Sequence, residues 1–519
     1  MSNADRVQMS FSKERIFGQV ADGIQAQGTL TLDTNPANTD AMTLDAKTYT
    51  FQTVLTDVDG NIQIGATLSE TQDNIRDAIN LTGTPGTQYA ASMTLHPTIS
   101  ADAANGFIGN DLVLTAKTPG TAGNALVSTE TFTAGTNVFD AATLGTTQAG
   151  VEADYQILRM TGETLQLNTD TVTSNEIRND RVTADIIRTN LSAAGDLNLE
   201  MSFGAYDVLM ETAFQSAPFT SDVSDTQSTF SMDASDNSIN DSGSGFIAAG
   251  FLVNQWFRSS GFLGGNAANN AIFKIVSVAA GKMVLNSGTL GVVVTEAAGD
   301  TVTIKQGGQI LNGTTQLSFT FEKEFTDLIE VFTQVTGLTT DGFNLTIAAG
   351  EIITGAFNFL GKNENSAKVT AAASKIAAPT NDIMNAVDNI AAILENKISI
   401  QVLQTSFAIV NALRQRPAVG VLGPISLGAG QIGISGTVQV YFEDQDLMDK
   451  YRNFTETSLA IVATDNSGNS YIFEFPAIKL TIGNANATGL NTDVIAEMTF
   501  GGKLNSSEGI MMRIARIAA

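Results

Sequence analysis

Apolar and polar residues alternate over short stretches along most of this chain, and clusters of turn-forming residues separate the stretches. Phe343, Leu345 and Ile347 fall on one face of such a stretch, and residues 353–359 continue with the same period after a turn at Gly350. Because successive side chains of a strand point to opposite faces of a sheet, a period of two is typical of half-buried strands. The chain is therefore predicted to be mainly β.

Apolar residues repeat at the spacing of a helix in only three segments, which are residues 69–79, 206–213 and 383–394. Ser69 and Gln72 have the spacing of a capping box at the start of the first segment. Ser202 is available as the N-cap of the second. The sequence therefore predicts a β protein with few helices.

Composition divides the chain into three units. Residues 28–149 are rich in Thr, Ala and Gly, have a β–β–α–β pattern with an expected hairpin at Asp59-Gly60, and contain 12 acids against 3 bases. Residues 226–308 form a second β-rich block with the single tryptophan, Trp256, which is expected in its core. The two blocks are predicted to be small inserted domains, one α+β and one β. They interrupt one discontinuous domain, made of residues 1–27, 150–225 and 309–519.

Residues 361–380 combine polar composition with weak periodicity, so they are predicted to form a long mobile loop. The glycine pattern at 428–433 resembles a dinucleotide fingerprint, but a strand-like segment follows it where the fingerprint requires a helix. We therefore interpret these glycines as a turn.

The residue counts exclude several kinds of chemistry. There is no cysteine and only one histidine, His96, so thiolate metal sites and catalysis by two imidazoles are excluded. With 27 basic and 53 acidic residues, the net charge is −26, which disfavours binding to a phosphate backbone. No catalytic, cofactor-binding or metal-binding residue is predicted, and the chain is not expected to be an enzyme.

Targeting signals are not expected either. The first residues lack the apolar core of a secretory signal, and no stretch approaches the about 20 apolar residues of a membrane span. We therefore expect no membrane segment, and assembly in a cytoplasm.

Three segments, in this order, resemble the tail tube (major tail) proteins of long-tailed bacteriophages. Residues 173–211 are similar to the opening of these proteins, residues 342–362 to their paired central strands, and residues 436–479 to their C-terminal strands. The block 28–149 departs from the family pattern, and the resemblance does not imply its role.

The resemblance implies a tail-tube β-sandwich or partial barrel with one flanking helix. Six such subunits form a ring with a continuous inner barrel, and rings stack into a tube that conducts genomic DNA into the host without sequence-specific binding. Partners would be other copies of the chain and the tape measure, terminator and tip proteins, and the location would be the virion tail, assembled in the host cytoplasm. The loop at 361–380 would then dock on the adjacent ring. Separately from the resemblance, block 28–149 is expected to project outward, because an insertion into a β domain is tolerated only at an exposed loop.

The resemblance also nominates inner-barrel strands, at residues 341–360 and 436–444. Four acids at the ends of these strands are the candidates to meet the passing DNA: Asp341, Glu351, Glu443 and Asp444. An acidic wall repels phosphates within a Debye length of about 8 Å, so DNA would slide rather than bind. The alternative is that these acids pair with bases such as Lys323 or Arg414 across subunits.

Two other classes of protein remain as alternatives. An adhesin-like or surface-array β protein shares the acidic, Thr- and Gly-rich composition, but it predicts a secretion signal. A polysaccharide hydrolase predicts an acidic cleft lined with aromatic side chains, which an aromatic content of 7% does little to support.

Overall fold

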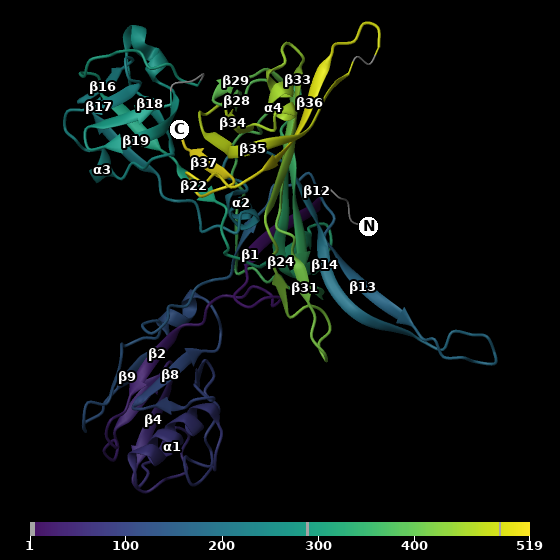
Figure 1. Cartoon of the computed structure of the whole chain (residues 1–519). Helices are drawn as coiled ribbons and strands as arrows, with labels where there is room; N and C mark the ends of the chain where they lie inside the picture. The colour runs from purple at the N-terminus through teal and green to yellow at the C-terminus, as the bar shows by residue number, and fades with distance from the viewer. Residues whose placement is uncertain (1–5, 287–289, 487–488) are drawn as a thin grey trace.

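The computed structural model describes residues 6–286, 290–486 and 489–519 (Figure 1). Within these residues strands dominate and helices are short, so the prediction of a mainly β protein is confirmed. No helix in the described part of the chain is long and apolar enough to cross a membrane. The chain forms a central body with two smaller bodies attached to it, one from residues 27–139 and one from residues 223–306.

The central body is built on a run of antiparallel strands that we call the wide sheet. In spatial order these strands are β14 (Ile186–Glu200), β25 (Thr354–Gly361), β24 (Phe332–Ala348), β30 (Val402–Val410), β33 (Gly433–Tyr441) and β36 (Ile495–Gly502). The predicted hairpin is present as β24 and β25, with Phe343, Leu345 and Ile347 buried on one face. Gly350 turns the chain between them at a φ of +83°, a region that favours glycine.

A second sheet, the back sheet, covers the apolar face of the wide sheet. Its strands are β28 (Ile390–Glu395), β34 (Glu456–Thr464), β35 (Ser470–Asn486), β37 (Arg513–Ile517) and β22 (Gly308–Leu311). The ring of Phe407 lies 5.3 Å from the rings of both Phe473 and Phe475, so side chains of the two sheets meet in one core. The arrangement is a sandwich, and the two sheets join where β35 pairs with β36.

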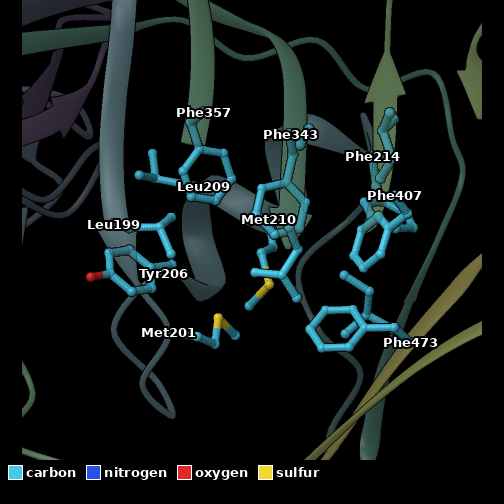
Figure 2. Close-up of a cluster of buried hydrophobic side chains, with 14 of the residues drawn as sticks. Leu199, Met201, Tyr206, Leu209, Met210, Phe214, Phe343, Phe357, Phe407 and Phe473 are labelled. Carbon is cyan, nitrogen blue, oxygen red and sulfur yellow. The ribbon is translucent and has the colours of Figure 1, made fainter. Parts of the chain in front are cut away.

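Helix α2 (Asp207–Ala213) packs into this core, as its spacing predicted. Leu209 and Met210 are buried beside the phenylalanines of the wide sheet (Figure 2). The predicted cap is wrong, because the N-cap is Tyr206, which makes no side-chain cap. Ser202 instead accepts a hydrogen bond of 3.1 Å from Arg159.

The first half of β24 extends beyond the wide sheet, where it pairs with β23 (Phe319–Phe325) and β26 (Asn363–Ala367). Strand β1 (Val7–Lys13) in turn pairs with β23 and with β11 (Asp154–Ile157). Strands β12 (Gly162–Glu163) and β13 (Gln166–Thr173) pair with β14, and β31 (Arg414–Arg416) pairs with β32 (Ser426–Gly428). The central body also contains β29 (Ile398–Ser399) and α4 (Asp446–Arg452).

The structure contradicts the mobile loop predicted over residues 361–380. Strand β26 pairs with β24, and β27 (Ser374–Ile376) runs parallel to β11. Between the two strands, the fully buried Glu322 accepts hydrogen bonds from Thr370 Oγ1 at 2.5 Å and from Ala371 N at 2.7 Å. Strand pairing and a buried carboxylate therefore hold this segment in the central body.

The helix predicted over residues 383–394 is also wrong. Its second half is strand β28, which pairs with β34. Ile393 belongs to the sandwich core and Leu394 to a cluster on the outer side of the back sheet, so both faces of this strand are buried. An apolar run that is buried on both faces carries no period of two.

Residues 27–139 form two small sheets around a core of their own. One sheet contains β10 (Val138–Phe139), β2 (Gln27–Thr31), β8 (Asp111–Ala116), β6 (Ile99–Ala101) and β7 (Phe107–Ile108). The other contains β5 (Asn61–Gln63), β4 (Lys47–Gln52), β3 (Ala41–Leu44) and β9 (Ser128–Glu130). The short 3₁₀ helix η2 (Thr121–Ala125) follows β8.

Two local predictions in this body are corrected. The capping box of α1 (Leu68–Asn80) is formed by Thr67 and Glu70 rather than by Ser69 and Gln72. Strands β4 and β5 are parallel, so Asp59-Gly60 does not close a hairpin.

Residues 223–306 form a single sheet with a short helix, α3 (Phe246–Ala249), and a 3₁₀ helix, η3 (Gly264–Asn269). The strand order is β15 (Val223–Gln227), β21 (Val302–Gln306), β18 (Trp256–Ser260), β19 (Ile272–Ala279), β20 (Lys282–Leu285), β17 (Ser238–Asp241) and β16 (Phe230–Asp233).

Trp256 does not lie in the core of this body, which corrects the prediction. It packs with Ile272 against back-sheet residues such as Leu394 and Val462. Its indole Nε1 donates a hydrogen bond of 2.9 Å to Glu474 of β35. The tryptophan therefore belongs to the seam between residues 223–306 and the back sheet.

Candidate functional site

The wide sheet has one face that is not covered by the back sheet, and we call it the polar face. Strand register places its side chains in rows, because residues paired across neighbouring strands point to the same side. One row runs Glu200, Thr354, Thr346, Ser406, Thr437, Thr499. The next runs Asn198, Ala356, Asn344, Ala408, Ser435, and a third joins Ala348, Gln404, Gln439 and Glu497. Asp196 and Asn358 complete the polar face.

The side chains of the polar face are short, and most are neutral. All of them are half-buried or exposed, whereas most of the intervening residues of the same strands are buried in the sandwich core. Ser406 and Thr437 share a hydrogen bond of 2.8 Å between their hydroxyls, and Asn358 donates to Asp196 at 2.8 Å. Within the wide sheet, the charges on these positions are the carboxylates of Asp196, Glu200 and Glu497, and none of the positions is Lys or Arg. The second row continues through Gly501 of β36 to Lys479 of the back sheet, whose ammonium lies over the ring of Phe454.

The acids predicted from the sequence all lie off this surface. Glu351 is exposed in the turn between β24 and β25, and Glu443 and Asp444 are exposed just after β33. The end of β24 lies beside the start of β30, where Ala348 pairs with Gln404, and the start of β30 lies beside the end of β33, where Val402 pairs with Val440. The turn after β24 and the segment after β33 therefore lie beyond the same end of the wide sheet. The structure thus brings these acids to one rim of the polar face.

Asp341 is separated from the other candidates. It lies near the opposite end of the wide sheet, at a break in register between β24 and β25. Its carboxylate accepts a hydrogen bond of 2.8 Å from the backbone of Leu413, and its carbonyl accepts one of 2.7 Å from Asn411. Asp341 therefore holds the segment that follows β30.

One of the bases considered as a partner for these acids is already occupied. Lys323 is buried, donates to the carbonyl of Leu165 at 2.6 Å, and lies 2.9 Å from Glu163. Asp444 also has a local role, because its carboxylate accepts a hydrogen bond of 2.9 Å from the backbone of Asp446 at the start of α4.

The acids of the polar face, Asp196, Glu200 and Glu497, were missed from the sequence. Each alternates with buried apolar residues, such as Leu197, Leu199 and Met498, and that alternation was the available signal. Which strands lie side by side, and hence which acids share a face, depends on long-range register that no local pattern contains.

The described residues contain no group of three or more His, Asp or Glu side chains that could hold a metal ion. What the site offers is an extended sheet surface with hydroxyl and amide groups, a few carboxylates and, within the wide sheet, no cation in its rows.

Comparison with known proteins gives a family for the chain. The model of the phage tail tube protein family matches residues 133–502, which include every strand of the wide sheet and most of the back sheet. No curated protein matches the chain.

Proposed function

The chain belongs to the phage tail tube protein family, and we propose that six copies form a ring, that rings stack into the tail tube, and that the polar faces line its lumen. As a member of this family the chain is a structural component of a phage tail. We also propose that the chain assembles in the host cytoplasm and that the tube contacts the tape measure, terminator and tip proteins.

The observation that carries the proposal is the composition of the polar face. A lumen that conducts DNA must not bind it, and binding to DNA comes mainly from Lys and Arg that neutralise phosphates and release counterions. Within the wide sheet, the rows of the polar face contain neither residue. Hydroxyl and amide side chains keep the surface wetted, while Asp196, Glu200 and Glu497 repel phosphates that approach within about 8 Å.

The same argument supports a role without catalysis. DNA would pass along a wall of short side chains, with no group positioned to act on it. The rim acids Glu351, Glu443 and Asp444 would add negative charge at one end of each subunit's share of the wall.

We propose different placements for the two inserted blocks. Residues 28–149 would project outward, since the chain enters and leaves this body through adjacent segments, with Ile24 bridged to Val151 and Gln27 to Gln148. Residues 226–308 would be a fixed part of the tube wall, because Trp256 and Lys274 are bonded to Glu474 of the back sheet.

Electron microscopy of the assembled full-length chain tests the proposal directly. We expect hollow tubes made of sixfold rings, with the polar face on the inner wall and residues 28–149 outside. Closed particles, sheets or an inner wall formed by the back sheet would contradict it.

A further inference from the structure

Phe454 adopts a backbone conformation that favours glycine. It follows Asn453, the C-cap of α4, at a φ of +51°. Its backbone N–H donates to the carbonyl of Tyr451 at 3.1 Å, and that of Thr455 donates to the carbonyl of Lys450 at 2.9 Å, which is the pattern of a Schellman motif. Glycine is usual at this position of the motif, because a side chain is strained in the left-handed region. A phenylalanine in this place points to a use for its ring.

The ring of Phe454 covers a cation. The ammonium group of Lys479 lies 4.1 Å from the ring centroid. A cation within about 6 Å of an aromatic face is attracted by the electrons of the ring. Phe454 is 53% exposed and does not belong to the sandwich core, so burial within the chain does not explain its conformation. The contact with Lys479 is the one that the structure gives to the ring.

Lys479 stands at the edge of the polar face. It pairs with Gly501, and Gly501 pairs with Ser435, so its side chain leaves the sheet on the same side as that row. Gly501 has no side chain, and the nearest atom to where its Cβ would lie is Thr481 Cγ2, at 3.8 Å. Neighbouring strands are only about 4.8 Å apart. The stem of Lys479 is therefore long enough to extend over Gly501 toward the middle of the polar face.

Lys479 is not paired with a carboxylate in the described part of the chain. Glu456 lies directly across from it on β34, but the carboxylate of Glu456 is paired with Lys503, which follows β36. Within the same described residues, the side chain of Lys479 makes no hydrogen bond either. Of the two lysines at this edge, Lys503 is thus compensated by an acid, whereas Lys479 is held by the ring of Phe454.

We propose that Phe454 is a positioning residue that holds Lys479 away from the path of the DNA, a role that rests on the proposed tube function. Within the wide sheet, the rows of the polar face contain no lysine or arginine. A mobile Lys479 would add six cations to the wall of each ring in the proposed hexamer. These cations would bind phosphates by releasing counterions and so slow the DNA. The ring of Phe454 competes with the phosphates for the ammonium group.

The rate of DNA release from particles that carry Phe454→Gly tests this role. Glycine relieves the strained conformation, so the variant should fold as well as the natural chain. Phe454→Asn is a second variant, because asparagine also tolerates the left-handed region. We expect release at least about twofold slower than from natural particles in about 50 mM salt. The rate should approach the natural one in about 200 mM salt, because one lysine–phosphate contact weakens about threefold over this range.

Rescue separates a role through Lys479 from a merely structural one. Phe454→Gly combined with Lys479→Gln should release DNA at the natural rate, because the freed cation is absent. Phe332→Ala is the matched control. It also removes a ring from over a lysine, Lys375, but in the part of β24 that extends beyond the wide sheet. This control should leave the rate unchanged at both salt concentrations.

Three results would overturn the role of Phe454. The first is an equal rate from Phe454→Gly and natural particles at low salt, and the second is slow release that Lys479→Gln does not restore. The third is loss of normal tails in both Phe454 variants, which would make this residue a contact between copies. Tubes formed by the natural chain would leave the proposed function standing in all three cases. If the natural chain forms no tubes, the tube function itself fails, and the role of Phe454 with it.

Discussion

His96 is fully buried among residues 27–144, and its hydrogen bonds require one neutral form of the ring. Nε2 lies 2.9 Å from the carbonyl of Leu44, which can only accept, so this nitrogen carries the proton. Nδ1 accepts hydrogen bonds from the backbone of Ile99 at 2.9 Å and of Thr98 at 3.3 Å. Burial lowers the pKa of His96 below its usual value, although the bond to Leu44 acts in the opposite direction.

A pH dependence follows from this lowered pKa. Above pH of about 6.5 the ring is neutral in both the folded and the unfolded chain, so the free energy of unfolding is unaffected. As the pH falls below that value, the unfolded chain binds the proton first, and stability falls by up to about 1.4 kcal/mol per pH unit until the folded pKa is reached. The protection factors of the β6 and β8 amides, which are corrected for the intrinsic pH dependence of hydrogen exchange, should therefore fall between pH 7.5 and 5.5. His96→Gln, which can donate to Leu44 and accept from Ile99, should remove most of this dependence; an unchanged dependence in that variant would contradict the assignment.

Single residues of the candidate site were harder to predict than the strands that carry them. Glu351 and Glu443 were chosen because they end apolar strands, and the structure places them at a rim. Glu200 and Glu497 were not chosen, because each is one polar residue among many in an alternating segment. Only the pairing of distant strands brings them to one face.

Among the elements, local alternation predicted β24 and β25 because each of these strands has one buried and one wet face. It failed for β28, which is buried on both faces, and for residues 361–380, whose polar side chains bond to buried groups elsewhere in the chain. The hairpin predicted at Asp59-Gly60 was also wrong, because β4 and β5 are parallel. In each case the structure of the segment is determined by the strand or side chain of the same chain that it packs against, rather than by its own sequence.

Glu322 gives a test at this scale. Replacing it by Ala removes the acceptor of Thr370 Oγ1, of Ala371 N and of the buried Gln334 Nε2. Leaving a buried donor unsatisfied costs about 1–3 kcal/mol, and the half-buried donors of Thr370 and Ala371 should cost less. Residues 363–376 should then open locally and become sensitive to protease in the folded chain. Glu364→Ala, on β26 itself, is the matched control; equal protease sensitivity in the two variants would contradict the role of Glu322.

The seam of residues 223–306 gives a second test. Glu474 is buried and accepts from Lys274 at 2.6 Å, Arg513 at 2.7 Å and Trp256 at 2.9 Å. Burial would raise the pKa of Glu474, but Lys274 and Arg513 outweigh it and hold this pKa below its usual value. Glu474→Gln leaves Lys274 and Arg513 to share the one carboxylate of Glu508, so we expect a loss of up to about 3–5 kcal/mol. Thermal unfolding measures it. Glu456→Gln, which breaks the exposed pair with Lys503, should cost less than about 1 kcal/mol. A loss as small as that for Glu474→Gln would show that the seam does not depend on this carboxylate.

At the scale of the whole molecule, the two attached bodies should behave differently when isolated. Residues 24–151 contain a complete core and close on themselves at Ile24 and Val151, so this fragment should be soluble and unfold cooperatively. Residues 220–309 would expose Trp256 and Ile272 and leave Lys274 without Glu474, so this fragment should bind a hydrophobic dye or aggregate. Dye binding and thermal unfolding of the two fragments check both expectations. A disordered 24–151 fragment would contradict its independence.

The charge of the lumen is the prediction that tests the assembled molecule. Glu200 lies in the central row of the polar face, so Glu200→Lys would place six cations in each ring of the proposed hexamer, where the natural wall has carboxylates. Because cations bind phosphates by releasing counterions, DNA should leave such particles more slowly at low salt, and the defect should shrink as salt rises. Glu330→Lys makes the same charge change at an exposed turn outside the wide sheet and should leave the rate unchanged. The measurement is the rate of DNA release from particles whose tails have normal length by electron microscopy. If Glu200→Lys and Glu330→Lys particles release DNA at the same rate at low salt, the polar face does not line the path of the DNA.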